Sequence, residues 1–92
     1  MVKREFIIRN KVGLHARPAS LLVQTAKKFK SKIIIYKNEE KANAKSIINV
    51  LSLGVEKDTK IVIEVDGEDE REALETIENL IKNDFEESDE KS

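Results

Sequence analysis

The chain is predicted to be a single α+β domain, with three helices covering one face of a mostly antiparallel, four-stranded sheet. Its 92 residues are enough for one small domain, expected over residues 1–88, with an acidic tail at residues 86–92 that is expected to fray. Segments of helical and of strand periodicity follow one another in the order β-α-β-β-α-β-α. This order favours a split arrangement, in which the last strand lies between the first two and the second sheet face meets solvent.

The strand predictions follow from alternating apolar residues and from β-branched composition. The strands are expected at residues 2–9, 33–36, 40–43 and 60–66. The second is the most β-prone stretch of the chain, and the first and the last alternate apolar with polar residues. The third is polar and has only Ala42 to bury, so it is expected at an edge of the sheet.

The helix predictions follow from apolar spacing and from terminal residues. The helices are expected at about residues 16–29, 47–53 and 70–85. Pro18 places the start of the first, because proline fits only the first turn of a helix. Ser46 is expected to cap the second helix and Gly54 to end it. Asp69 is expected to begin the third in a capping box with Glu72.

Composition excludes several classes of function. The net charge is −1 although 38% of the residues are charged, so neither nucleic acid nor an acidic lipid surface is indicated as a partner. The chain has no cysteine and one histidine, which excludes disulfides and thiolate or histidine-rich metal sites, and no cofactor is expected. It lacks an apolar run of the ~20 residues that span a membrane, and the apolar core of a signal peptide. A cytoplasmic protein is expected.

The only histidine, His15, stands at the predicted start of the first helix, in the segment Gly-Leu-His-Ala-Arg-Pro-Ala-Ser of residues 13–20. The first N–H groups of a helix have no helical acceptor, so those of Ala16 and Arg17 can form an anion site. The guanidinium of Arg17 suits a phosphate. A neutral imidazole at this place can act as a nucleophile. A histidine that merely caps the helix is the alternative, and the residues alone leave both interpretations open.

The segment Gly-Leu-His-Ala-Arg-Pro-Ala resembles the active-site signature of HPr, the histidine phosphocarrier family of the bacterial sugar phosphotransferase system. A second block, Asn-Ala-Lys-Ser-Ile-Ile at residues 43–48 with Leu-Ser-Leu-Gly at residues 51–54, resembles the regulatory serine region of that family. The two blocks have the expected spacing, and the likeness runs from about Val2 to Phe85. It implies an open-faced β-sandwich with strand order 1-4-2-3.

The resemblance also implies a function. Enzyme I would phosphorylate His15 using phosphoenolpyruvate, the group would pass to sugar-specific IIA proteins, and Arg17 would balance its charge. An HPr kinase/phosphorylase would phosphorylate Ser46, and that form would join a catabolite-control transcription regulator. The sequence shows no general base, metal site or phosphate-binding loop, so the chain is expected to be a carrier and not an enzyme. It is also expected to be a monomer.

A partner surface is expected around His15, from the polar face of the first helix and the apolar face of the second. Its candidate residues are Ser20, Gln24, Lys27, Ile47, Ile48 and Leu51. For the apolar three, burial in the core is an alternative, and for Lys27 the alternative is an ordinary solvated face. Asn49 stands where relatives with this serine block usually have glycine, and Ile48 replaces a common methionine.

Three other functions are alternatives to the carrier. A regulatory binding module of the same fold would have no need of His15. A nitrogen-branch phosphocarrier would keep the histidine, but the serine block favours the sugar branch. An acyl-carrier or RNA-binding module is disfavoured, because Ser46 lacks an Asp-Ser-Leu context and the strands lack the aromatic residues on which RNA bases stack.

Overall fold

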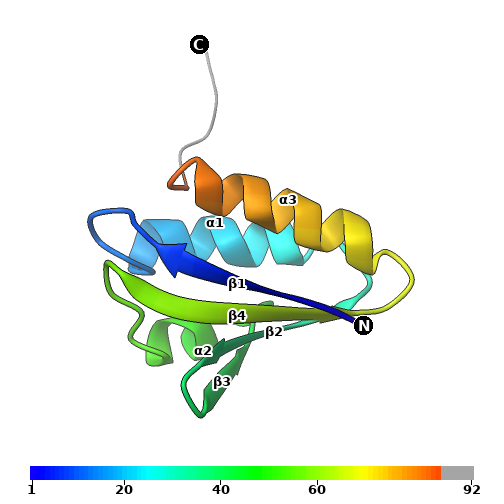
Figure 1. The fold of residues 1–92 in the computed structure, drawn as a ribbon, viewed down its shortest axis with the longest axis horizontal. Helices are drawn as coiled ribbons and strands as arrows, with labels where there is room; N and C mark the ends of the chain where they lie inside the picture. The colour runs from blue at the N-terminus through cyan, green and yellow to red at the C-terminus, as the bar shows by residue number, and fades with distance from the viewer. Residues whose placement is uncertain (86–92) are drawn as a thin grey trace.

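The computed structural model describes residues 1–85, and the predicted acidic tail, residues 86–92, lies outside the described residues. Figure 1 shows the predicted order of elements. They are β1 (Val2–Ile8), α1 (Ala16–Ala26), β2 (Lys32–Lys37), β3 (Glu40–Asn43), α2 (Ile47–Ser52), β4 (Thr59–Asp66) and α3 (Glu70–Lys82). No strand end differs from the expected one by more than one residue, which is within the normal uncertainty of such assignments.

The sheet has the order β1-β4-β2-β3, and all three neighbouring pairs are antiparallel. The predicted strand order and the edge position of β3 are therefore confirmed. The inner strand β4 pairs on one side with β1 and on the other with β2, so that Ile63 lies opposite both Arg4 and Ile35. The outer edges of the sheet belong to β1 and β3.

The core lies between the sheet and the helices because each element buries the face that its periodicity predicts. On β4 the buried residues are Ile61, Ile63 and Val65, and on α1 they are Pro18, Ala19, Leu22, Val23 and Ala26. Each large aliphatic side chain removed from water contributes about 1.5–3 kcal/mol to the free energy of unfolding.

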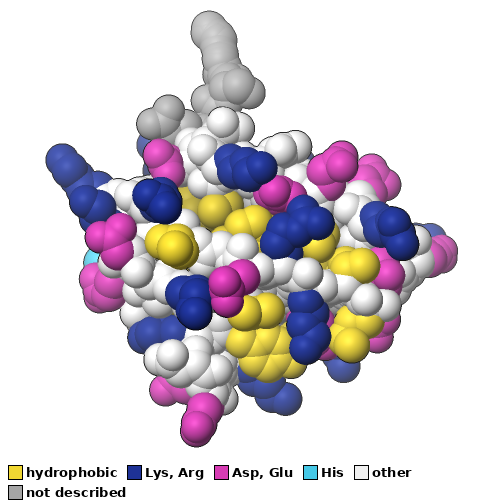
Figure 2. Space-filling model, viewed as in Figure 1, with side chains coloured by type: hydrophobic (Ala, Val, Ile, Leu, Met, Phe, Trp, Pro, Cys, Tyr) yellow, Lys and Arg dark blue, Asp and Glu magenta, His cyan; other side chains and the backbone are white. Residues whose placement is uncertain are grey.

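On the face of the molecule seen in Figure 2, charged side chains of both signs are interspersed with small hydrophobic areas, in keeping with the net charge of −1.

The prediction that α1 continues to Phe29 is wrong, since the helix ends at Ala26. The next N–H groups, those of Lys28 and Phe29, bond to carbonyls three residues back instead of four. Such tight turns end a helix. The carbonyl of Phe29 then accepts a hydrogen bond from the ammonium group of Lys45 at 2.7 Å, while the phenyl ring still packs against the core.

The predicted capping box at Asp69 is also wrong. Asp69 is the N-cap of α3, but its carboxylate makes no bond to the helix. It accepts instead from the backbone N–H groups of Lys30, at 2.9 Å, and Ser31, at 3.0 Å, and from the hydroxyl of Ser31. Three donors from another loop satisfy a carboxylate better than the single N–H group that a capping box offers. The side chain of Glu70 accepts from the N–H group of Gly67 at 3.1 Å, which ties the start of the helix to the preceding turn.

Candidate functional site

The loop before α1 is held from within and from a second loop. The N–H group of Gly13 donates to the carbonyl of Asn10 at 3.1 Å, and the amide of Asn10 donates back to the carbonyl of Gly13 at 2.7 Å. The N–H group of Leu14 donates to the carbonyl of Val55 at 2.9 Å, and the Leu14 side chain is buried. Sequence reasoning predicted the turn but missed the roles of Asn10 and Val55. The spacing of asparagine and glycine could have suggested the first, whereas the second depends on tertiary contact.

His15 is the N-cap residue of α1, and its side chain is exposed and makes no capping hydrogen bond. The geometry therefore does not support the interpretation of His15 as a helix cap. Its carbonyl accepts the first helical bond, from the N–H group of Ala19 at 2.9 Å. The N–H groups of Ala16 and Arg17 precede that bond and Pro18 has none, so two donors at the positive end of the helix are available to an anion.

Arg17 is exposed and, among residues 1–85, has no carboxylate within ion-pair distance. It lines a surface hollow of about 440 Å³ together with Lys11, Pro18, Asp84 and Phe85 among others. Two cations therefore stand near the start of α1. A helix terminus contributes about 0.3–1 kcal/mol to an exposed anion, and up to ~2 kcal/mol when the anion is partly buried. The site can hold a phosphoryl group, but it is too weak to catalyse a difficult transfer alone.

Ser46 caps α2 as predicted, since its hydroxyl accepts from the N–H group of Asn49 at 3.3 Å. Gly54, in the left-handed region at φ +63°, follows the helix end as predicted. A contact that sequence reasoning missed closes the same end: the ammonium group of Lys37 donates to the carbonyls of Leu53, at 3.0 Å, and Gly54, at 3.1 Å. The departure at Asn49 leaves the cap intact, because only its backbone takes part.

The apolar residues of α2 divide between two faces. Val50 and Leu53 are buried, whereas Ile47, Ile48 and Leu51 are 37%, 72% and 43% exposed. These three are therefore available to a partner. On α1, Gln24 is exposed, and Ser20 is half-buried and accepts from the Gln24 amide at 3.0 Å. Lys27, the C-cap residue of α1, is also exposed. Since α1 and α2 contact each other, the candidate residues of both helices lie on adjoining elements.

No helix among residues 1–85 is long and apolar enough to cross a membrane. No group of three or more histidine, cysteine, aspartate or glutamate side chains in the same part of the chain could hold a metal ion.

Fold and site together define a small α+β carrier domain, with an exposed histidine at a helix start that can bind an anion. The family described as "PTS HPr component phosphorylation site" matches residues 2–83. The chain belongs to this family, the HPr phosphocarriers of the bacterial phosphotransferase system. It is accordingly a phosphocarrier and not a catalytic enzyme.

Relatives support this assignment over most of the chain. The phosphocarrier protein HPr of Mycoplasma capricolum is 48% identical over 77 residues, covering 84% of this chain and 86% of that protein. The HPr of Neisseria meningitidis is 42% identical, covering 92% of this chain and 96% of that protein. The crystal structure of HPr-C-His from Thermoanaerobacter tengcongensis has a TM-score of 0.92 at 45% identity, covering 96% of this chain and 99% of that one.

Some structural relatives are dimers. An HPr dimer from Thermoanaerobacter tengcongensis has a TM-score of 0.76 at 46% identity, covering 95% of this chain and 100% of that one. Crh of Bacillus subtilis, a catabolite repression protein described as a swapped dimer, has a TM-score of 0.73 at 40% identity, with the same two coverages.

Proposed function

We propose that His15 accepts a phosphoryl group from phosphorylated enzyme I and passes it to sugar-specific IIA proteins. The observation that carries this proposal is the exposed His15 ring beside the available N–H groups of Ala16 and Arg17. In the transfer, the lone pair of the His15 Nδ1 atom forms a bond to phosphorus while the bond between phosphorus and the donor nitrogen breaks. The two N–H groups and the Arg17 guanidinium then face the new negative charge.

We also propose that an HPr kinase/phosphorylase modifies Ser46 and that this weakens phosphorylation of His15. A phosphate at a helix N-cap adds about −1.5 to −2 charges at a place that the helix dipole favours, so the fold should tolerate it. The cost falls on docking, because Ser46 adjoins the exposed side chains of Ile47 and Ile48. The serine-phosphorylated form would then bind a catabolite-control transcription regulator.

Enzyme I and the IIA proteins are proposed to dock on the exposed surfaces of α1 and α2. This surface comprises Ser20, Gln24, Lys27, Ile47, Ile48 and Leu51. The carrier is proposed to act in the cytoplasm and as a monomer. Because some relatives are dimers, the molar mass in solution should be measured at working concentration, and it is expected to be that of one chain.

A second candidate is a regulatory or nitrogen-branch protein of the same fold that acts mainly by binding other proteins. The likeness to Crh, at 40% identity, favours the regulatory version. The presence of His15 favours the carrier, and the two candidates differ in whether that residue is phosphorylated.

The deciding experiment is incubation with enzyme I and labelled phosphoenolpyruvate, followed by mapping of the label. We expect label on His15 alone, labile to acid and stable to alkali as a phosphoramidate is, and no label on His15→Ala. Label that survives this substitution or resists acid would contradict the proposal. If the wild-type chain takes up no label but still binds the HPr kinase/phosphorylase or the transcription regulator, the regulatory candidate is favoured.

A further inference from the structure

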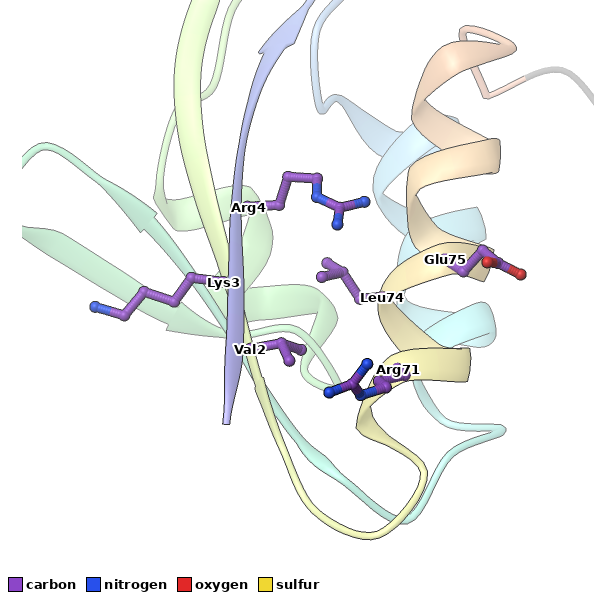
Figure 3. A pocket seen from close by; sticks show the side chains of 6 residues that line it. All are labelled: Val2, Lys3, Arg4, Arg71, Leu74 and Glu75. Carbon is purple, nitrogen blue, oxygen red and sulfur yellow. The ribbon is translucent and has the colours of Figure 1, made fainter.

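A second surface feature lies between the first half of β1 and the start of α3. It is a hollow of about 440 Å³ lined by Val2, Lys3, Arg4, Arg71, Leu74 and Glu75. Figure 3 shows that Val2 and Arg4 of β1 and Leu74 and Arg71 of α3 extend into the space between the two elements, whereas Lys3 and Glu75 point away from it. The interior of the hollow is therefore formed by two aliphatic side chains and two guanidinium groups.

Ion pairs fix both ends of this hollow. The N-terminal ammonium group lies 3.0 Å from the carboxylate of Glu70, which holds the beginning of β1 against the beginning of α3. At the other end Arg4 pairs with Glu78, which also binds Lys82 at 2.9 Å. These contacts link the strand to the helix at both ends of the hollow.

Arg71 is the cation that remains available. Among residues 1–85 no carboxylate lies within ion-pair distance of its guanidinium. Glu75 is one helical turn away, but it points in the opposite direction (Figure 3). An exposed guanidinium beside the aliphatic side chains of Val2 and Leu74 is suited to a carboxylate that comes with an apolar neighbour.

The open edge of β1 adds a second kind of binding group. β1 pairs only with β4, so the outward backbone N–H and C=O groups of this strand have no strand partner within the described part of the chain. Natural sheets discourage pairing at such edges with charged residues, and Lys3 and Glu5 stand on this one. An added strand must therefore place a negative charge beside Lys3 and beside Arg71, and an uncharged residue beside Glu5. These requirements restrict which segments can pair with the edge.

We propose that this hollow and the free edge of β1 form a docking site for an extended acidic segment of a partner protein. The segment adds a strand to β1 through backbone hydrogen bonds. Its inward side chains place an aliphatic group on Val2 and Leu74 and a carboxylate on Arg71. An outward carboxylate meets Lys3.

The docking site is separate from the histidine site. The hollow lies at the N-terminal end of β1, whereas the loop that carries His15 follows the C-terminal end of the strand. Seven residues of strand span about 20 Å. A segment bound in the hollow therefore leaves the surface of α1 and α2 open, and the inference does not depend on the proposed phosphoryl transfer.

The test uses the blocked heptapeptide Ser-Val-Glu-Glu-Ser-Val-Ser, titrated into the full ¹⁵N-labelled chain. In an extended strand its second, fourth and sixth residues place valine, glutamate and valine on one face, and its third residue places a glutamate on the other. Amide signals of Val2 to Phe6 and of Arg71 to Glu75 are expected to shift, and hydrogen exchange along β1 to slow. A matched peptide with lysine in place of glutamate should produce neither effect. Shifts confined to α1 and α2, or no shifts at millimolar peptide, would overturn the proposal.

Two variants separate a site from general charge attraction. Arg71→Glu is expected to raise the dissociation constant roughly tenfold or more, because it replaces a charge-assisted hydrogen bond by repulsion. Lys57→Glu makes the same change of net charge at an exposed position in the loop before β4, and should have little effect. Equal weakening in both variants, or none in Arg71→Glu, would show the proposal to be wrong. So would β1 shifts that depend on protein concentration alone, because the edge would then pair with a second copy of the chain.

Discussion

Gly13 shows how a single residue places the histidine. Its backbone lies in the left-handed region at φ +64°, and an added Cβ atom would come 2.3 Å from the carbonyl oxygen of Val55. That oxygen is the acceptor for the N–H group of Leu14, directly before His15. A side chain at position 13 must therefore move the loop that carries the histidine.

We expect Gly13→Ala to lower the free energy of unfolding by about 1–3 kcal/mol and to slow phosphorylation, because strain and displacement occur together. Urea denaturation and labelling by enzyme I measure the two effects. Gly54→Ala is the matched control, since Gly54 has φ +63° but an added Cβ would find only the Lys37 ammonium group at 3.9 Å. The account fails if both substitutions cost the same.

Arg17 is the residue whose charge should matter more than its packing. We expect Arg17→Ala to slow phosphoryl transfer while changing the free energy of unfolding by no more than about 0.5 kcal/mol, the usual range for surface substitutions. Arg17→Lys should recover only part of the rate, because an ammonium group cannot bind phosphate in two places. Lys28→Ala removes an exposed cation near the far end of α1 and serves as the control. A large fall in melting temperature with normal transfer would instead show Arg17 to be structural.

At the scale of the element, the six residues of α2 both attach the helix to the fold and present apolar side chains to solvent. Ser46 begins it, Lys37 closes its end through backbone carbonyls, and Val50 attaches it to the core. Its other apolar residues face outward. They are not needed to hold the helix in place, because the caps and the buried Val50 side chain already fix the position of so short an element.

We expect Ser46→Asp to weaken binding to enzyme I without lowering the melting temperature, because aspartate still caps the helix while adding negative charge beside Ile47 and Ile48. Ser46→Ala should do the reverse: it loses the cap, at about 1 kcal/mol, and keeps its affinity. Affinity is measured by titration calorimetry and stability by thermal melting. If Ser46→Asp binds normally, α2 is not the docking surface, and if it melts early, the serine is only a cap.

At the scale of the whole molecule, Asp69 joins the start of α3 to the loop before β2. Its partners, Lys30 and Ser31, lie 39 and 38 residues away in the sequence. The Ser31 hydroxyl, followed by the backbone N–H group of Lys30, holds the pKa of the Asp69 carboxyl below its ordinary value of 3.8. A carboxyl with a lowered folded-state pKa stabilises the fold fully above its unfolded pKa. This contribution is lost as the pH falls through the folded value.

We therefore expect part of the acid destabilisation of this protein to disappear in Asp69→Asn. Urea midpoints measured from pH 7 down to about pH 2 should fall more steeply for the wild type than for the variant, because only the wild type must protonate this bonded carboxylate. Ser31→Ala, which removes the largest cause of the pKa shift, should lie between them. Parallel curves for all three proteins would refute this role of Asp69.

The sequence alone predicted the order of elements and the position of His15, because each depends on a signal within one segment. The strand order is a property of the whole sheet, and its prediction rested on the β-α-β-β-α-β-α order and on the resemblance to the HPr family. Alternation gave the buried faces of β1 and β4, and Pro18 and Ser46 marked helix starts through the geometry of a first turn. The site prediction drew in addition on the resemblance of residues 13–19 to the HPr signature.

Tertiary structure alone decided which distant groups satisfy the ends of these segments. Asp69 has the sequence context of a capping box, yet its carboxylate bonds to the loop at Ser31 because folding brings three donors there. The carbonyl of Val55 and the ammonium group of Lys45 likewise find their partners, Leu14 and Phe29, only in the folded chain. A polar group near a turn can form its hydrogen bonds with neighbouring residues or with residues distant in the sequence. Only the packing of the whole chain determines which donor comes within hydrogen-bonding distance.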